Sequence, residues 1–199
     1  MTYREGLNLA ATGKLVDSYG MFSRSASWYP GADNAWMSKA DLARQILAKP
    51  EVEESTKMDL YKDALDYLGR AEKLNPYRWQ TYVTRGKLVE ENPSYARNDW
   101  YKQAIADFRQ ALRVDPRAYE ARYRLALLLS QRGNEGAAGA ILEEGIIHFY
   151  ADHPSLIPYL KLTSEYRKRS GDLAGQGELE ERIQHILDSY RSRIHVSDS

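Results

Sequence analysis

Two stretches of the sequence decide its fold: residues 64–76 read ALDYLGRAEKLNP, and residues 104–116 read AIADFRQALRVDP. In each stretch an alanine, a large apolar residue, a second alanine and a proline follow one another at steps of four, three and five residues. Steps of four and three place the first three residues on one stripe of a helix. The proline falls just past the helix end, because it cannot continue the helical hydrogen-bond ladder. The spacing therefore predicts two copies of one helix.

The same pattern occurs twice more in the chain. One copy consists of Ser18, Phe22, Ser25 and Pro30, and the other of Ala138, Leu142, Gly145 and Tyr150, with tyrosine at the proline position. Each copy follows a segment with large and small residues of its own. These segments contain Gly6, Leu9 and Gly13; Trp36, Ala40 and Ala43; Tyr82, Gly86 and Val89; and Leu125, Ala126, Leu129 and Gly133. The chain is thus predicted to be an array of helical pairs.

This combination resembles the tetratricopeptide repeat, a helix–turn–helix unit of about 34 residues. The resemblance covers residues 1–150 closely and residues 155–193 loosely. It implies an all-α fold, an α-α superhelix of about four repeats, in which small residues let neighbouring helix axes approach to ~8–10 Å. We expect a single domain over residues 1–199, with repeats at 1–32, 33–78, 79–118 and 119–152.

Two repeats are longer than the family unit. Pro30 and Pro76 are 46 residues apart, and Pro76 and Pro116 are 40 apart. Because the pattern of the second helix is unchanged, the extra residues are expected between the two helices, at 48–59 and 92–99. The first insertion is polar and suits either a longer loop or an N-terminal extension of the second helix. The second ends in Asn98 and Asp99, which are typical of a turn before a helix.

The two ends of the chain depart from the repeat pattern. Residues 155–170 and 172–193 form two amphipathic segments broken at Gly171, and Gln176 and Glu180 stand at positions where a small and a large apolar residue are expected. A polar helical pair suits the end of an array, so 155–193 is interpreted as a capping hairpin. By the repeat phase, Met1 already lies inside a helix, and we expect the chain to be excised from a longer protein.

Composition restricts the partners. Lys plus Arg and Asp plus Glu each number 28, so the net charge is zero. Nucleic acids and anionic membrane surfaces attract a basic surplus, which argues against both as the main partner. The mean hydropathy of −0.64 and the lack of a long apolar run predict no membrane-spanning segment. The sequence contains no cysteine, which excludes disulfides and Cys-ligated zinc.

The sequence offers little for catalysis. None of His148, His153, His185 and His195 forms an i, i+4 pair for a metal. The run GNEGAAG at 133–139 lacks the spacing and the Lys-Ser or Lys-Thr of a phosphate loop, so Gly133 is interpreted as a turn residue. We expect no cofactor, no metal and no enzymatic activity.

The family resemblance implies a binding surface on the concave side, formed by the first helix of each repeat. The residues at the groove-facing positions mix amides, hydroxyls, aromatics and both charges. They are Tyr3, Arg4 and Leu7; Asn34, Met37, Ser38 and Asp41; Gln80, Val83, Thr84 and Lys87; and Glu120, Tyr123, Arg124 and Leu127. Family members that bind chaperone tails use Lys and Asn, whereas Tyr3 and Leu7 stand at those places here, so a chaperone-tail receptor is disfavoured.

Two functional interpretations remain open. The first is a scaffold that binds a protein or peptide. The second rests on residues 22–36, 70–93 and 151–172, which resemble the repeats that close bacterial O-antigen ligase and polymerase-type membrane proteins. That resemblance implies a periplasmic accessory domain, tethered to a membrane transferase and holding a glycan, an acceptor or a partner subunit; a cytoplasmic location is the alternative. Aromatic residues near the turns either join neighbouring hairpins or offer a ligand platform: Trp28, Tyr29, Tyr77, Trp79, Tyr95, Trp100 and Tyr101.

Overall fold

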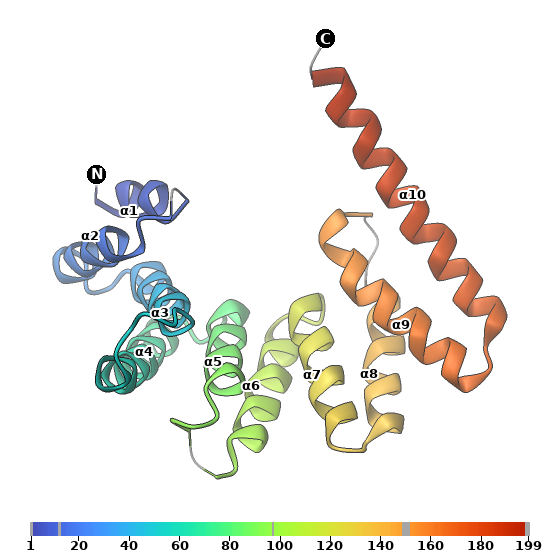
Figure 1. The fold of residues 1–199 in the computed structure, drawn as a ribbon, viewed down its shortest axis with the longest axis horizontal. Coiled ribbons are helices and arrows are strands. Elements are labelled where there is room, and N and C mark those ends of the chain that lie inside the picture. The colour runs from blue at the N-terminus through green and yellow to red at the C-terminus, as the bar shows by residue number, and fades with distance from the viewer. Residues whose placement is uncertain (1, 12, 97, 149–151, 198–199) are drawn as a thin grey trace. The chain divides into compact units, whose positions relative to one another are not determined.

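A computed structural model describes residues 2–11, 13–96, 98–148 and 152–197, and every regular element among them is a helix (Figure 1). The predicted all-α fold class is therefore confirmed. In chain order the elements are α1 (Thr2–Ala11), α2 (Leu15–Trp28), α3 (Asp33–Leu47), α4 (Glu54–Leu74), α5 (Trp79–Glu91), α6 (Trp100–Val114), α7 (Tyr119–Gln131), α8 (Glu135–Ile146), the 3-10 helix η1 (Pro154–Leu156), α9 (Ile157–Ser170) and α10 (Leu173–Ser197).

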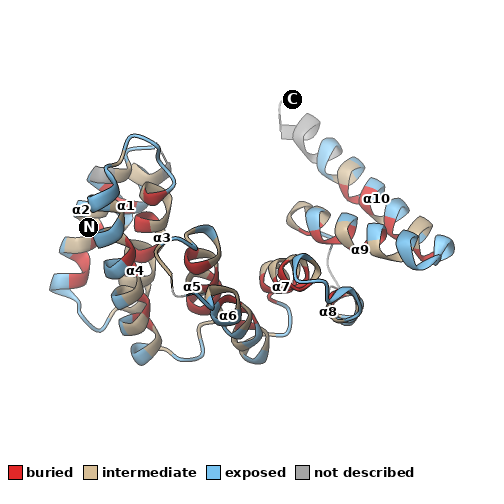
Figure 2. Ribbon diagram, turned by 60° about the horizontal axis from the view of Figure 1, so that its bottom comes forward, coloured by how far each residue is buried: buried red, intermediate tan, exposed pale blue. Residues whose placement is uncertain are grey.

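The helices form two compact units, which we call unit 1 (Met1–Val114) and unit 2 (Asp115–Ser199). In unit 1, α1 packs on α2, α3 on α4 and α5 on α6, while α2 and α4 contact the hairpins that follow them. In unit 2, α7 packs on α8 and α9 on α10, and α9 also contacts α7 and α8. Figure 2 shows the buried residues on the sides where paired helices face each other.

The recurring small residues lie where the sequence pattern places them. The first small residue of each second helix has no exposed surface, and these residues are Ser18, Ala64, Ala104 and Ala138. The large residues of the same stripe are buried as well, namely Phe22, Leu68, Phe108 and Leu142. This agreement confirms the register of the second helices.

The small residue on the first helix matches the size of its partner on the second. A Cβ atom on Gly6 would lie 2.8 Å from Cε1 of Phe22, and one on Gly86 would lie 2.6 Å from Cε1 of Phe108. In the two hairpins that carry leucine in place of phenylalanine, the first helix carries alanine: Ala40 with Leu68, and Ala126 with Leu142. Each pair thus fills a similar volume, as close packing requires.

A second recurring contact closes the turn between repeats. In three repeats the long side chain six residues after the proline donates a hydrogen bond to the carbonyl of that proline. The pairs are Trp36 Nε1 with Pro30 at 2.9 Å, the Tyr82 hydroxyl with Pro76 at 2.9 Å, and Arg122 Nε with Pro116 at 3.0 Å. These carbonyls lie beyond the helix end, where no helical N–H is available to them.

The two insertions contact each other. Helix α4 begins at Glu54, so the first insertion is partly a loop and partly an N-terminal extension of the helix, which reaches 21 residues. The second insertion is the loop between α5 and α6. Its Tyr95 ring lies 5.8 Å from the Tyr61 ring, and its hydroxyl donates to Glu54 Oε1 at 2.5 Å. Tyr95 therefore joins the loop to α4.

The last hairpin replaces the small–large contact with polar ones. Glu180 is exposed and accepts hydrogen bonds from Ser164 Oγ at 3.4 Å and from Gln176 Nε2 at 2.7 Å. The buried apolar residues of α10 lie beside this stripe, at Leu179, Ile183 and Ile186. Among the described residues, no helix is both long and apolar enough to cross a membrane.

Candidate functional site

The candidate residues of unit 1 lie on α1, α3 and α5 and already contact one another or their neighbours. The Tyr3 and Ser38 hydroxyls are hydrogen-bonded at 3.0 Å, which joins α1 to α3. The Asp41 carboxylate accepts from Arg44 Nη2 and Gln45 Nε2, both at 3.0 Å. The remaining candidates on these helices range from half-buried to exposed: Arg4, Leu7, Asn34, Met37, Gln80, Thr84 and Lys87.

One candidate of unit 1 was wrong. Val83 was expected to face the groove, yet it is only 3% exposed. The reason is that α5 packs against α3, α4 and α6. The apolar side chain of Val83 is taken up by the core, and no surface remains for a ligand.

In unit 2 three candidates meet in one groove. Glu120, Tyr123 and Arg124 of α7 line a groove of about 270 Å³, together with Tyr119. The opposite wall comes from the start of the last hairpin, and its residues are Ser155 of η1 and Pro158 and Tyr159 of α9. We call this the α7–α9 groove. Leu127, the fourth candidate on α7, is half-buried and does not line it.

The walls of the α7–α9 groove are fixed by local contacts. His153 Nδ1 accepts a hydrogen bond from the Ser155 backbone N–H at 3.2 Å and caps η1. The Tyr159 hydroxyl donates to the Leu142 carbonyl, and its side chain is 1% exposed. Burial raises the pKa of Tyr159, so its hydroxyl keeps the proton that it donates. The Tyr159 ring is therefore held in a fixed position in the α9 wall of the groove.

The α7–α9 groove is lined by one acidic and one basic side chain, those of Glu120 and Arg124. Arg124 Nε lies 3.9 Å from Glu120 Oε1, one helical turn away, and the two side chains are 25% and 36% exposed. This separation exceeds a hydrogen-bond distance. Surface ion pairs of this kind contribute only about 0–1 kcal/mol to stability.

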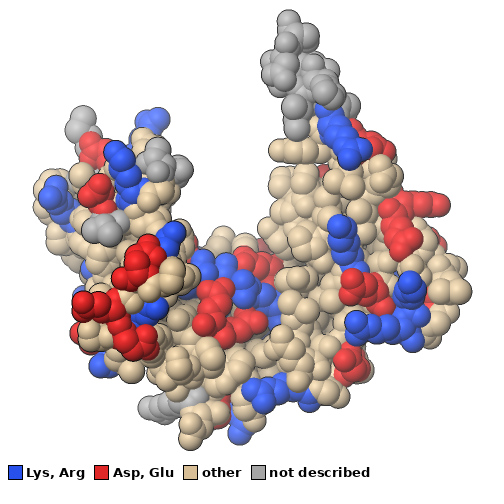
Figure 3. Space-filling view, in the orientation of Figure 1, with Lys and Arg blue, Asp and Glu red and all other residues tan. Residues whose placement is uncertain are grey.

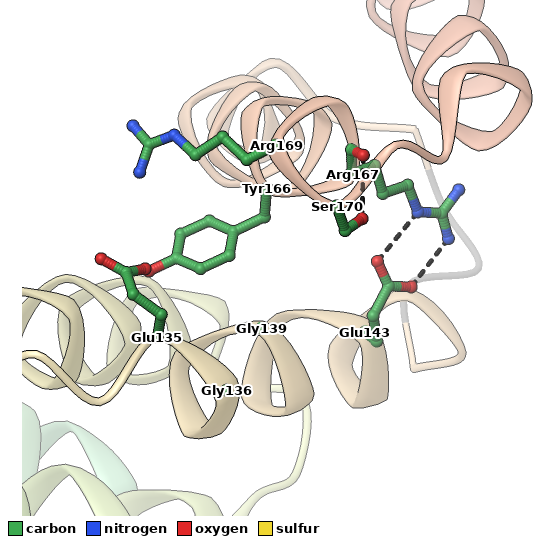
Figure 4. A pocket seen from close by; sticks show the side chains of 8 residues that line it. All are labelled: Glu135, Gly136, Gly139, Glu143, Tyr166, Arg167, Arg169 and Ser170. Atoms are coloured by element: carbon green, nitrogen blue, oxygen red, sulfur yellow. Dashed lines mark hydrogen bonds and ion pairs between the residues drawn. The ribbon is translucent and has the colours of Figure 1, made fainter.

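A second groove, of about 590 Å³, lies between α8 and α9 (Figure 4). Gly136 and Gly139 leave the middle of its α8 side without side chains, between Glu135 and Glu143. At one end, Arg167 Nε and Nη2 donate to the two Glu143 oxygens at 2.8 and 2.7 Å. At the other end, the Tyr166 hydroxyl lies against the Glu135 carboxylate and lowers its pKa. These contacts tie α8 to α9. Of the glycines in the GNEGAAG run, Gly133 has a φ of 74° and lies in the turn, as predicted, and a Cβ on Gly139 would lie 3.6 Å from the Tyr166 ring.

The face drawn in Figure 3 shows no large patch of one charge, and the described residues include no metal site. In Figure 3, acidic and basic side chains are interspersed over the face in view. No group of three or more His, Asp or Glu side chains in the described part of the chain is placed to hold a metal ion. The surface thus favours recognition through shape and hydrogen bonds over recognition through net charge.

Sequence reasoning missed half of the α7–α9 groove. Ser155, Pro158 and Tyr159 were assigned to a capping hairpin, because Gln176 and Glu180 break the repeat pattern there. The prolines at 154 and 158 gave a signal, since proline favours the first turn of a helix. They mark where a further first helix begins beside α7.

Comparisons with known proteins place this fold. Residues 98–154 match the family model described as tetratricopeptide repeat. No curated protein matches the sequence. Among solved structures, TTC0263, a thermophilic TPR protein in Thermus thermophilus, is 17% identical with a TM-score of 0.63, covering 97% of each chain.

Two further structures show the same arrangement. MamA is 14% identical with a TM-score of 0.62, covering 94% of this chain and 96% of its own. YrrB, a TPR protein, is 12% identical with a TM-score of 0.56, covering 100% of this chain and 91% of its own. At such identities the likeness concerns the fold. With the family match over residues 98–154 and the buried repeat pattern, it shows that the fold of this chain is similar to that of tetratricopeptide-repeat proteins.

Proposed function

We propose that this chain is a non-catalytic binding module and that the α7–α9 groove holds a peptide segment of a protein partner. The observation that carries the proposal is the meeting of Glu120, Tyr123 and Arg124 with residues of the following hairpin in one groove. Tyrosine and arginine are the residue types that dominate binding energy at interfaces. YrrB is a TPR protein with an unusual peptide-binding site, which is consistent with a peptide ligand on this fold.

A selection from randomised peptides tests the proposal without knowledge of the partner. The wild-type chain should enrich peptides that Tyr123→Ala and Arg124→Glu no longer bind, with a loss of about tenfold or more for each variant. Arg109→Glu and Tyr190→Ala are matched controls, because both residues are exposed and lie outside the groove. Selected peptides that bind the groove variants and the wild type equally would overturn the assignment of this site.

The second proposal is an accessory domain for glycan transfer on the periplasmic side of a membrane. The observation that favours it is the exposure of Trp28 and Tyr29, each 66%, since flat aromatic faces can pack on sugar rings. A glycan array probed with the wild type and with Trp28→Ala tests it. A glycan whose signal depends on Trp28 would support this alternative, and an array without such a glycan would contradict it.

A further inference from the structure

Three exposed aromatic side chains lie at the ends of second helices in unit 1. Trp28 is the last residue of α2, Tyr29 follows it, and Tyr77 lies in the turn between α4 and α5. They are 66%, 66% and 84% exposed. Within the described part of the chain, no hydrogen bond or ring contact engages these three side chains. Their rings are therefore open to a partner.

Two contacts hold these turns side by side. Trp36 Nε1 donates to the Pro30 carbonyl of the first turn at 2.9 Å, and the Trp36 ring centroid lies 4.9 Å from the Arg70 guanidinium carbon, near the end of α4. Arg78 of the second turn pairs with Asp33 at the start of α3, with its Nε 2.8 Å from Asp33 Oδ2. The aromatic side chains of the two turns therefore share one edge of unit 1.

Exposed cations accompany the aromatic rings. Arg24 stands one helical turn before Trp28 on α2, so the two side chains share a face of that helix. Lys73 is exposed in the last turn of α4, next to Leu74, which is also exposed. We call this surface the aromatic edge, and it consists of Arg24, Trp28, Tyr29, Lys73, Leu74 and Tyr77.

Acidic residues are scarce along the aromatic edge. Residues 18–32 contain none. Residues 67–78 contain one, Glu72, and its carboxylate pairs with Arg85 of α5. The edge is therefore locally basic in a chain whose net charge is zero.

We propose that the aromatic edge rests on a lipid surface that carries anionic headgroups. Tryptophan and tyrosine are enriched where a membrane meets water, because their rings enter the headgroup region while their polar atoms stay hydrated. Leu74 adds apolar surface for the same boundary, and Arg24 and Lys73 are placed to meet anionic headgroups. The contact is local, so it requires no net charge on the whole chain. It is also separate from the α7–α9 groove, which lies in unit 2.

Two other partners fit the aromatic edge less well. Sugar hydroxyls donate hydrogen bonds as well as accept them, whereas the side chains of Arg24 and Lys73 supply donors only. The centre of a protein–protein interface is depleted of charged residues, and of lysine in particular, whereas cations accompany the rings of this edge. A surface of anionic lipid uses both the rings and the cations.

Co-sedimentation of the full chain with vesicles tests this inference. We expect the wild type to bind vesicles of phosphatidylcholine with about 30% phosphatidylglycerol more tightly than vesicles of phosphatidylcholine alone. Trp28→Ala combined with Tyr77→Ala should weaken binding to the mixed vesicles about tenfold or more. Arg24→Glu combined with Lys73→Glu should weaken it by a similar factor and abolish the preference for anionic vesicles.

Two matched controls remove similar side chains outside the edge. Tyr190→Ala removes an exposed tyrosine of unit 2 and Arg109→Glu an exposed arginine of α6, so both should bind vesicles like the wild type. Circular dichroism should show that each variant is folded. Mixed vesicles should also shift the tryptophan fluorescence of the wild type to shorter wavelength, and Trp28→Ala should lose this shift, because the other tryptophans are half-buried.

Two results would overturn the inference: no binding to the mixed vesicles, or binding that the loss of Trp28 and Tyr77 leaves unchanged. A glycan signal that depends on Trp28, without vesicle binding, would likewise reject the lipid surface and assign the edge to sugars. The peptide-binding proposal is decided separately, because Tyr123→Ala and Arg124→Glu alter only the groove and should leave vesicle binding unchanged.

Discussion

At the scale of single residues, the packing of this protein depends on matched sizes across each hairpin. Glycine contacts phenylalanine in the first and third hairpins, and in the second and fourth, buried alanine and leucine occupy the equivalent positions. The summed volume of the two side chains is nearly constant from hairpin to hairpin, although the residue at each of the two positions changes. An interior glycine costs a helix about 1 kcal/mol of stability relative to alanine. The tight contact with phenylalanine explains why that cost is tolerated at Gly86.

Gly86→Ala is therefore expected to destabilise the protein by about 1–3 kcal/mol, because the added methyl group would lie 2.6 Å from Cε1 of Phe108. Gly69→Ala is the matched control: Gly69 is also helical, and a Cβ there meets nothing within 4 Å, so this change should be neutral or stabilising by up to about 1 kcal/mol. Adding Phe108→Leu to Gly86→Ala recreates the alanine–leucine pair and should be less destabilising than the two separate changes added together. Urea unfolding followed by circular dichroism measures all four variants, and strict additivity would contradict the matched-size account.

At the scale of helices and turns, the sequence predicted the elements that follow the repeat pattern and missed those that depart from it. The stripe that contains Ala64 and Ala104 gave the second helices in their correct register, because burial and spacing depend on the same small residues. The start of α4 at Glu54 could not be chosen from sequence, since a polar segment suits a loop and an exposed helical turn equally. The groove was half predicted: its α7 wall follows the family pattern, whereas its α9 wall begins after η1, which interrupts that pattern.

The contact between α7 and α8 should give the protein a dependence on acidic pH. Arg122 is 1% exposed, and its Nη2 donates to Glu144 Oε1 at 3.2 Å, which lowers the pKa of Glu144. A carboxylate with a lowered pKa in the folded state stabilises the protein above its unfolded pKa of about 4.3. That contribution is lost as the pH falls through the lower, folded value.

Glu144→Gln removes this titration, so its stability should fall less steeply than that of the wild type as the pH is lowered below about 4.3. Glu181→Gln serves as a control, because Glu181 is an exposed helical glutamate of the same unit. Unfolding free energies measured by urea titration at a series of pH values give the comparison. Parallel pH profiles for the wild type and Glu144→Gln would show that the ion pair contributes nothing to folding.

At the scale of the whole molecule, charge balance is the dominant property. The net charge is zero and the sequence pI is about 6.9, so near neutral pH little net repulsion keeps copies apart. On the face drawn in Figure 3, charges of both signs are interspersed, so that face has no patch of one sign to steer a charged partner. Recognition by this protein is therefore expected to rest on short-range contacts.

Two measurements follow from this balance. Light scattering at low salt should show a solubility minimum at about pH 7 and improved solubility above about pH 8.5, where the chain gains net negative charge.

Affinity for a peptide selected on the α7–α9 groove should change little between low and physiological salt, because an ion pair, not a charged patch, borders that groove. A steep loss of affinity with salt would instead indicate recognition by charge.

The hydrogen bonds to the proline carbonyls bear on how such repeats are found elsewhere. Indole, phenol and guanidinium groups perform one task at equivalent places, at Trp36, Tyr82 and Arg122. What recurs from one unit to the next is a hydrogen-bond donor that reaches the proline carbonyl, while the residue type that supplies the donor differs. A profile that scores residue identity column by column will penalise this drift, whereas one that scores donor reach and side-chain length would group the three units together.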